Sequence, residues 1–298
     1  NYRADMSSPV TGWDGCSRLS PHLAWGSLSI REAFQALETR RRELKDRPSE
    51  ERGPRWLPSL VSFGARLRWH CHFMQKLEDE PALEFRNLNR TFDGLREDAF
   101  DEEHFAAWCE GRTGYPMVDA SMRCLHRHGW VNFRMRAMLV SFASYHLWLH
   151  WRPTAVYLAR HFLDFEPGIH FSQFQMQSGV TGINTVRIYS PIKQVRDQDP
   201  GGEFIRRFVP ELRGVPDEHL AEPHRMSPSE QDRAGCRIGR DYPAPIVEHA
   251  SAYREARRRM SEARRQDGAR EEAERVYRKH GSRKRPTRRS PRRKEEKA

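Results

Sequence analysis

The sequence has few of the features that mark secreted, metal-stabilised or membrane-spanning proteins. Its five cysteines are odd in number and none belongs to a CxxC pair, so the pattern indicates neither a disulfide framework nor a structural zinc site. We therefore expect a protein of the reducing cytoplasm. The most apolar stretch, residues 137–151, is too short to span a bilayer and predicts a buried helix. No signal peptide is visible, but the chain opens at Asn1, so what precedes it stays open.

Alternation of apolar and polar residues, which is typical of a half-exposed strand, is nearly absent as well. Proline, glycine and charge instead divide the chain into helical segments, of which residues 27–42 and 60–77 are amphipathic. Pro116 and Gly129 are placed to begin and end another helix. A long helix is expected to follow and to reach Trp151. The sequence therefore predicts an all-α fold.

Positive charge is concentrated at the C-terminal end. Residues 281–298 hold nine Lys or Arg and two Glu, a net charge of +7, which leaves +4 of the total of +11 for the rest of the chain. This basic tail has no apolar residues that could pack, so we expect it to be disordered. Basic tails bind polyanions without sequence preference. Contact with nucleic acid and a purely solubilising role both remain open. Residues 252–280 are also highly charged and predict an exposed helix that leads into the tail.

A set of longer motifs lies in one order along residues 113–212. It reads TGYPMVDASMRCL, GWVNFRMR, HWRPTAVYLARHFLDFE, TGINTVRIYSPIKQ and DPGGEFIRRFVPEL, and DYPAPIVEH follows at residues 241–249. In this order the motifs resemble the C-terminal FAD-binding domain of DNA photolyases and cryptochromes. The resemblance implies a helical FAD-binding domain over residues 1–250 and a charged helix with a basic disordered tail over residues 251–298. The α/β antenna domain that precedes this domain in the family is not part of the sequence, so no antenna chromophore is assigned.

Residues 16–21 read CSRLSP where the family has TSRLSP. Unpaired amides and the helix dipole favour a phosphate group at the start of a helix. The resemblance assigns this run to the FAD pyrophosphate. The cofactor contacts that it implies are Tyr2, Ser17, Arg18, Leu19, Ser20, His70, Arg136, Asp164, Glu166 and His170.

Two of these positions bear on the flavin ring itself. Arg134 and Arg136 lie two residues apart on a helix and should point in different directions. By resemblance, Arg136 pairs with Asp164 beside the isoalloxazine ring, and Glu166 replaces a second aspartate of the family. His170 takes the place of the residue that faces flavin N5, commonly asparagine in photolyases. Because histidine titrates near neutrality, it can donate a hydrogen bond there or transfer a proton.

The lesion-binding cavity determines the substrate in this family, whose photolyases flip a damaged dinucleotide out of DNA. Trp69 matches a tryptophan that stacks on the lesion, and Arg134 matches an arginine of the pocket. Four positions depart from the family, with Arg66 for glutamate, Phe133 for asparagine, Ala137 for methionine and Met176 for a second tryptophan. These exchanges alter hydrogen bonding and shape. They leave open a different lesion, a single-stranded substrate or loss of repair. The substrate contacts that we expect are Arg66, Trp69, Phe133, Arg134 and Met176.

The resemblance also implies three tryptophans that conduct electrons to the flavin. Only the middle one, Trp151, is present, because Phe174 occupies the inner place and Asp98 the outer. Phenylalanine is much harder to oxidise than tryptophan. Trp148 and Tyr145 offer a detour, although aromatic residues at helical spacing more often belong to the core.

Taken together, the residues predict a blue-light flavoprotein with bound FAD that transfers an electron to a damaged pyrimidine pair in DNA, with Trp151 and His170 in catalytic roles. The alternative is a cryptochrome-type photoreceptor without repair activity, and a third possibility is a flavin-holding nucleic-acid-binding protein without photochemistry. The run His70-Cys71-His72 predicts no metal site, because consecutive side chains fan around a helix and cannot all reach one ion.

Overall fold

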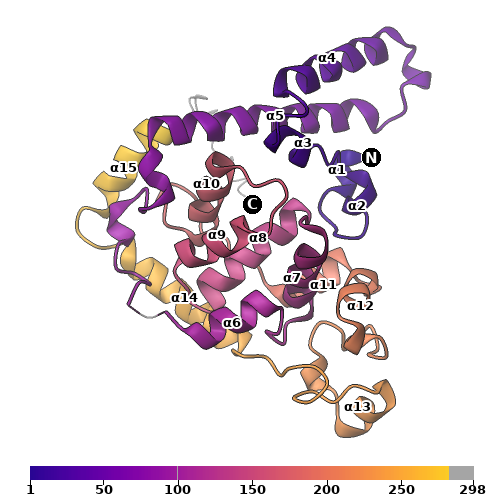
Figure 1. Ribbon diagram of the computed structural model, residues 1–298, viewed down its shortest axis with the longest axis vertical. Coiled ribbons are helices and arrows are strands. Elements are labelled where there is room, and N and C mark those ends of the chain that lie inside the picture. Colours follow the sequence, from indigo (N-terminus) through magenta and orange to yellow (C-terminus); the bar gives the residue numbers. More distant parts are fainter. Residues whose placement is uncertain (99, 282–298) are drawn as a thin grey trace, which may run out of the picture.

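Helices make up the regular structure of the chain, as the sequence predicts (Figure 1). The computed structural model describes residues 1–98 and 100–281, and the predicted tail from residue 282 onward lies outside them. In these residues there is no β-sheet, and one isolated bridge joins Ile238 to Tyr242. The helices are α1 (Tyr2–Asp5), α2 (Gly12–Gly15), α3 (Ser20–Ala24), α4 (Ile30–Asp46), α5 (Trp56–Asp79), α6 (Glu102–Glu110), α7 (Pro116–His128), α8 (Phe133–Ser141), α9 (Trp151–Ala159), α10 (Pro167–Ser178), α11 (Pro191–Gln198), α12 (Glu203–Phe208), α13 (Pro228–Ala234), α14 (His249–Ala263) and α15 (Ala269–His280).

α4 and the first half of α5 form a hairpin that extends beyond the rest of the molecule (Figure 1). α4 begins at a capping box, in which the Ser29 hydroxyl accepts from the Glu32 amide and the Glu32 carboxylate accepts from the Ser29 amide. The hairpin has a small core of its own that includes Leu37 and Leu67. Gly64 allows this packing, since a Cβ there would lie 2.7 Å from Leu37 Cδ2. α5 then continues along α10, and so connects the hairpin to the main body.

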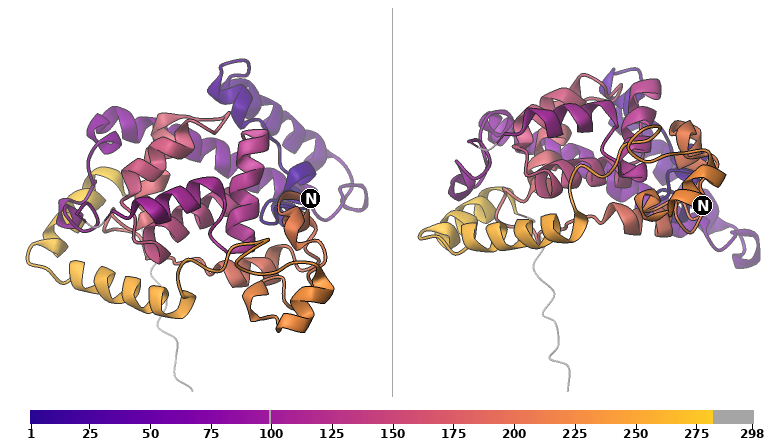
Figure 2. Two further views of the ribbon diagram at one scale, coloured as in Figure 1. Left: turned by 60° about the horizontal axis from the view of Figure 1, so that its bottom comes forward. Right: turned by 90° about the horizontal axis from the view of Figure 1, so that it is seen from below.

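The charged segment near the C-terminus forms two helices, which corrects the prediction of one exposed helix. α14 and α15 are separated by a turn in which Gly268 has φ of +77°. Both helices lie along one edge of the molecule (Figure 2). Met260 and Val276 are buried against the main core, so these helices are amphipathic despite their charge. At the end of α15, His280 Nε2 lies 2.6 Å from a Glu80 carboxylate oxygen at the end of α5.

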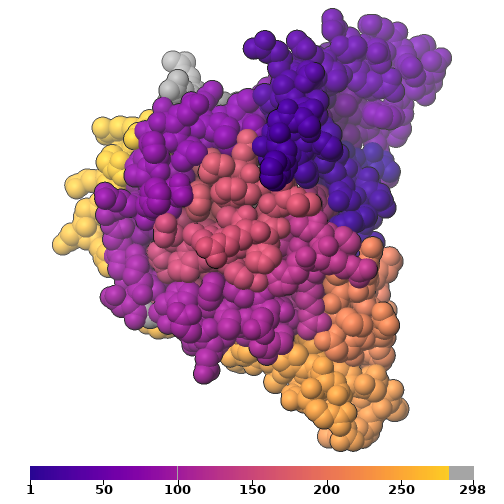
Figure 3. Space-filling model, viewed as in Figure 1, coloured from indigo at the N-terminus to yellow at the C-terminus, as the bar shows by residue number. Residues whose placement is uncertain are grey.

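The N-terminal segment with α1, α2 and α3 packs against the helical body. On the face shown in Figure 3, it lies beside the surface formed by α9 and α10. The Asn132 side-chain amide donates to the Ser7 carbonyl oxygen at 2.9 Å. Trp25 Nε1 donates to the Leu163 carbonyl oxygen at 2.7 Å. These contacts fix the predicted cofactor-binding run, residues 16–21, next to the loop that precedes α10.

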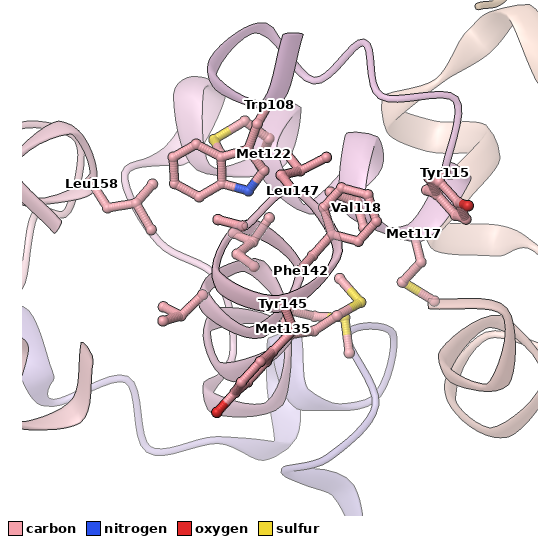
Figure 4. Close-up of a cluster of buried hydrophobic side chains, with 14 of the residues drawn as sticks. Trp108, Tyr115, Met117, Val118, Met122, Met135, Phe142, Tyr145, Leu147 and Leu158 are labelled. Carbon is pink, nitrogen blue, oxygen red and sulfur yellow. The ribbon is translucent and has the colours of Figure 1, made fainter. Parts of the chain in front are cut away.

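The main core is built around α7 and α8. α7 begins with Pro116, whose missing N–H is not needed in a first turn, and ends at Gly129 with φ of +63°. Both ends agree with the prediction. Figure 4 shows Trp108 from α6, Met122 from α7 and Met135 from α8 gathered with other buried side chains in this core. Because α7 is buried along most of its length, it is a fixed support for α8.

The predicted long helix up to Trp151 is interrupted. α8 ends at Ser141, a π-helical turn covers Phe142–His146, and α9 begins only at Trp151. Between them Trp148 adopts the left-handed conformation, with φ of +53°. Pro153 then falls in the first turn of α9, where a proline is tolerated. The apolar pattern of residues 137–151 thus reflects burial of the whole segment and not one continuous helix.

A buried carboxylate joins the C-terminal loop to α7. Asp119 is 0% exposed and accepts hydrogen bonds from the Thr113 amide at 2.8 Å, the Thr113 hydroxyl at 2.6 Å and the Tyr242 hydroxyl at 2.5 Å. The Gly114 amide donates to its second oxygen at 3.1 Å. Since Gly114 has φ of +77° and its Cβ would lie 2.4 Å from the Ala244 carbonyl oxygen, a larger residue cannot replace it without moving the loop.

We expect Tyr242→Phe to lower the free energy of unfolding by about 1–3 kcal/mol, because the buried Asp119 carboxylate loses a hydrogen bond that water cannot replace. Urea denaturation at neutral pH measures this change. Tyr277→Phe is the matched control, since Tyr277 is 47% exposed, and it should leave stability unaltered. Equal stability of the two variants would show that the Tyr242 hydroxyl contributes nothing.

Candidate functional site

A cavity of about 310 Å³ lies between the N-terminal segment, α5, α8 and the region of α9 and α10. This volume is within the range of small-molecule sites, about 300–1,000 Å³. Apolar side chains form most of its wall, and polar groups are gathered at a few places. On one side of it the N-terminal segment meets the surface of α9 and α10 (Figure 3). The cavity therefore combines segments that lie far apart in the sequence.

The predicted cofactor residues all line this cavity. They are Tyr2, Ser17, Arg18, Leu19, Ser20, His70, Arg136, Asp164, Glu166 and His170. Among the predicted substrate residues, Arg66, Trp69 and Phe133 also line it. Arg134 and Met176 are not part of its lining, and neither is Trp151.

Some lining residues were not identified from the sequence. On α8, Val140 completes a face with Phe133, Arg136 and Ala137 at helical spacing, which is a signal that the sequence does contain. Trp130 belongs to the motif GWVNFRMR but carried no prediction of its own. For the remaining lining residues, such as those of the loop before α10, the sequence pattern does not predict which side chains face the cavity, and only the folded structure shows it.

The centre of the polar wall is an ion pair between Arg136 and Asp164. The two guanidinium nitrogens donate to the two carboxylate oxygens at 2.9 and 2.8 Å, while Arg136 Nε donates to the Val131 carbonyl oxygen at 2.8 Å. The Phe162 ring lies 4.2 Å from the guanidinium carbon. Burial alone would raise the pKa of Asp164, but the Arg136 guanidinium, helped by the Ser20 hydroxyl, lowers it. The pair is therefore ionised at neutral pH and rigidly held.

Residues 16–20 of the predicted cofactor-binding run line the cavity. In the described part of the chain, none of the amides of residues 17–20 has a hydrogen-bond acceptor. Arg18 has φ of +52°, a conformation that costs a residue other than glycine about 1–3 kcal/mol. Its guanidinium stacks on Trp13 and Trp130 at 4.3 and 4.9 Å from the ring centroids, which offsets part of this cost. α3 is only five residues long, so the free amides and Arg18, more than a helix dipole, suit an anionic group.

Other buried polar atoms of this wall have no partner. His70 Nε2 lies 2.8 Å from a Glu166 carboxylate oxygen, but without the alignment of a hydrogen bond. Within the described residues, His70 Nδ1 and the Gln173 side-chain oxygen have no hydrogen-bond partner. Buried polar atoms are rarely left unsatisfied in folded proteins. Both side chains line the cavity, so they mark places where a bound molecule would supply hydrogen-bonding groups.

A second cavity, of about 490 Å³, lies next to the opposite side of α8. Arg134 points into it and Arg136 into the first cavity, which confirms that these two arginines diverge. The lining residues are Arg134, Arg187, Ile188, Tyr189, Ser190, Lys193, Gln194, His249 and Tyr253. Lys193 is paired with Asp197 at 3.0 Å. Among the residues described, Arg134 and Arg187 have no carboxylate partner, so this cavity is strongly cationic.

Residues 63–262 match the family described as the FAD binding domain of DNA photolyase. The chain belongs to this family. It is 31% identical over 257 residues to a deoxyribodipyrimidine photo-lyase of Alkalihalophilus pseudofirmus, an alignment that covers 86% of this chain and 50% of the relative. A class III photolyase from Agrobacterium tumefaciens has a similar structure, with a TM-score of 0.78, 29% identity and coverage of 89% of this chain and 52% of that one. A Synechocystis cryptochrome follows, with a TM-score of 0.75, 28% identity and coverage of 86% and 51%. The chain thus spans about half the length of these proteins.

The family confirms FAD as the cofactor of this photolyase-type domain, and the first cavity fits it. The free amides of residues 17–20 with Arg18 would hold the pyrophosphate, and the Arg136–Asp164 pair would hold the edge of the ring system. The unsatisfied atoms of His70 and Gln173 would gain partners. FAD supplies one-electron chemistry on absorbing blue light. The individual contacts remain predictions.

His170 has a defined protonation state in this FAD domain. Its Nε2 lies 2.8 Å from the Ala155 carbonyl oxygen, which can only accept, so Nε2 carries the proton and Nδ1 is left as an acceptor. The residue is 8% exposed. Burial lowers the pKa of His170 to about 4, with the Arg136 charge acting in the same direction. This corrects the expectation of a group that titrates near neutrality, because the ring is a neutral hydrogen-bond acceptor under physiological conditions.

This state of His170 predicts how stability depends on pH. Its pKa falls from an ordinary 6.5 to about 4 on folding, so the unfolded chain binds a proton that the folded protein excludes. The neutral His170 costs no stability above pH 6.5. As the pH falls from 6.5 to 4, the free energy of unfolding should decline by about 3 kcal/mol. Asparagine does not titrate, so the free energy of unfolding of His170→Asn should decline by about 3 kcal/mol less over the same pH range. Urea unfolding at several pH values measures the difference, and identical pH profiles would contradict it.

No helix in the described ranges is long and apolar enough to cross a membrane. Residues 1–98 and 100–281 also contain no group of three or more His, Cys, Asp or Glu side chains that could hold a metal ion.

Proposed function

We propose that this protein is a blue-light flavoenzyme of the photolyase type, which uses FAD to transfer an electron to a damaged pyrimidine pair in DNA. The observation that carries the proposal is the wall of the FAD cavity. Two large aromatic side chains of that wall reach solvent, since Trp69 is 50% exposed and Phe133 is 47% exposed. Large apolar side chains that are exposed at the wall of a pocket are typical of a binding surface. Their position supports entry of a flipped nucleotide at this wall.

The chemistry of this opening suits nucleobases. The Arg66 guanidinium lies 5.0 Å from the Phe133 ring centroid, and Trp69 packs against Phe73 with the ring centroids 5.5 Å apart. Aromatic rings and guanidinium groups stack on bases without strict sequence preference. Arg66 donates hydrogen bonds where a carboxylate would accept them. We therefore propose pyrimidine carbonyl oxygens, and not amino groups, as the partners of Arg66 in the lesion.

The second cavity supports DNA as the partner. Arg134 and Arg187 present guanidinium groups that no carboxylate of the described residues neutralises, and Lys193 lies beside them. Such groups bind phosphates through charge-assisted hydrogen bonds. Since nothing in this arrangement requires base pairing, single-stranded DNA is included in the proposal. The five free cysteines support a reducing cytoplasmic location.

A second candidate is a cryptochrome-type photoreceptor without repair activity. The similarity to the Synechocystis cryptochrome and the altered cavity residues Arg66, Phe133 and Ala137 favour it.

Light-dependent repair separates the two functions. FAD-loaded protein is illuminated with blue light in the presence of a thiol and ultraviolet-damaged oligonucleotides, single-stranded and duplex in parallel. The proposal predicts that the thymine absorbance lost on dimer formation returns in light and not in the dark, with undamaged DNA as the control. Photoreduction of FAD without repair of either substrate would favour the photoreceptor and contradict the enzyme.

A further inference from the structure

Trp151 is the one tryptophan of the family's electron-transfer chain that this sequence keeps, and it has no neighbour here to which it could pass a positive charge. Trp151 is 0% exposed and does not line the FAD cavity. Its nearest ring neighbours are Phe171, with centroids 6.5 Å apart, and His150, at 5.7 Å. Both rings are harder to oxidise than indole. Trp151 Nε1 donates to the Asn87 side-chain oxygen at 2.7 Å, and an amide cannot take up the proton of an oxidised indole. A positive charge placed on Trp151 would therefore stay there and return to the flavin.

Positively charged side chains oppose electron transfer through Trp148 or Tyr145. The Arg96 guanidinium lies 4.4 Å from the Trp148 ring centroid and 5.5 Å from that of Tyr145. The Arg259 guanidinium lies 5.0 Å from the Trp148 ring centroid as well. Arg96 is 2% exposed, so solvent does not screen its charge. An oxidised ring beside it would be destabilised by like-charge repulsion.

Another pair of tryptophans leads from the cavity to the surface. Trp130 lines the FAD cavity and is 6% exposed. Its ring centroid lies 5.7 Å from that of Trp13, in an edge-to-face arrangement. Trp13 belongs to α2 and is half-buried, so it is accessible from solvent. Electron transfer between aromatic rings falls steeply with the gap between them, and these two rings are in contact.

The surroundings of Trp13 favour its oxidation more than those of Trp148. The Arg207 guanidinium lies 5.7 Å from the Trp13 ring centroid, but Arg207 is exposed, so solvent screens its charge. Arg18 stacks on both tryptophans, and it is exposed and screened as well. Its run is also the predicted place of the pyrophosphate, whose negative charge would offset it. The His128 ring lies 4.9 Å from the Trp13 ring. Burial lowers the pKa of His128, with nearby arginines adding to the effect, so it is a neutral base at pH 7.

We propose that Trp130 and Trp13 conduct electrons to FAD in this protein, in place of Trp151. Trp130 gives one electron to photoexcited oxidised FAD, and Trp13 gives one electron to the oxidised Trp130 ring. The oxidised Trp13 ring releases its indole proton to His128 or water. A thiol in solution then returns one electron and one proton to Trp13 and leaves a thiyl radical. This inference rests on the proposed function, because it requires a photoactive FAD.

The test compares Trp130→Phe, Trp13→Phe and the matched control Trp151→Phe, each loaded with FAD. The rate of flavin reduction under blue light with a thiol is followed by absorbance, and the tryptophan radical by transient absorption and electron paramagnetic resonance. We expect Trp130→Phe to lose most of the photoreduction rate and the radical signal. Trp13→Phe should lose the long-lived radical and slow the reduction. Trp151→Phe should match the wild type in both readouts.

Chemical reduction by dithionite in the dark identifies the variants that still hold FAD correctly. Trp13 does not line the cavity, so Trp13→Phe keeps the test valid even if Trp130→Phe binds FAD poorly. Wild-type rates and radical signals in Trp13→Phe, or loss of both in Trp151→Phe, would overturn this inference and leave the proposed function standing. Absence of photoreduction in the wild type would instead overturn the proposed photochemistry, and the inference with it.

Discussion

Asp164→Ala is expected to lower the free energy of unfolding by about 3 kcal/mol and to empty the FAD site. The Asp164 side chain is 2% exposed, and it is the ionic partner of Arg136. Its removal leaves a guanidinium in a wall of low polarity without a counter-charge. The estimate is at the lower end for buried pairs, because Arg136 keeps 26% of its side chain exposed. FAD affinity should fall as well, since the freed guanidinium no longer has a fixed position.

Chemical denaturation of the apoprotein and titration with FAD measure these two effects. The control is Glu211→Ala, which removes a more exposed partner of Arg123 and should cost no more than about 1 kcal/mol. The pH dependence has a definite sign. Because folding lowers the pKa of Asp164, its stabilising effect is complete above about pH 4 and is lost as the pH falls further. A difference between wild type and variant that persists unchanged in strong acid would contradict the ion pair as its cause.

Replacing both Arg134 and Arg187 by alanine should weaken DNA binding by roughly 10–100-fold for each phosphate that the protein no longer binds. These two arginines line the cationic cavity beside α8 and have no carboxylate partner in the part of the chain that the structure describes. Binding of each phosphate also releases counterions from the DNA. The slope of log affinity against log salt should therefore become shallower by about 0.9 per phosphate with duplex DNA and about 0.7 with single strands.

Fluorescence anisotropy with a labelled oligonucleotide, repeated over a series of salt concentrations, gives both quantities. Arg278→Ala is the control, since Arg278 is on α15 and its side chain is 78% exposed. The control should leave affinity and slope near the wild-type values. If the double variant and the control lose affinity equally, DNA does not use the cavity beside α8. Because phosphates carry no sequence information, the decrease in affinity should be similar for damaged and undamaged DNA.

Much of the site could be predicted where local rules and motif order apply. Pro116 and Gly129 mark the ends of α7 because first-turn proline and left-handed glycine are local requirements. The divergence of Arg134 and Arg136 follows from helix geometry alone. The residues predicted to contact the cofactor from the order of the family motifs all line one cavity. These features could be predicted because local residue preferences, helix geometry and motif order determine them.

Other features depend on contacts between distant segments. His170 is neutral because it is buried and bonded to the Ala155 carbonyl oxygen, and neither fact follows from its type. The π-helical turn at Phe142–His146 interrupts an apolar run whose pattern predicts one helix. Trp13 and Trp130 are 5.7 Å apart only because the N-terminal segment folds back onto the start of α8. Such properties arise from tertiary packing, which pattern and propensity do not specify.

The most direct measurement of the central claim is FAD binding by the purified chain. Apoprotein is titrated with FAD, and the bound fraction is separated by gel filtration and measured by flavin absorbance. The structure predicts one bound FAD per chain, retained through the column by the wild type and lost by Asp164→Ala. A wild-type chain that folds but elutes without FAD would contradict the assignment of the cavity, and with it the proposed photochemistry of this protein.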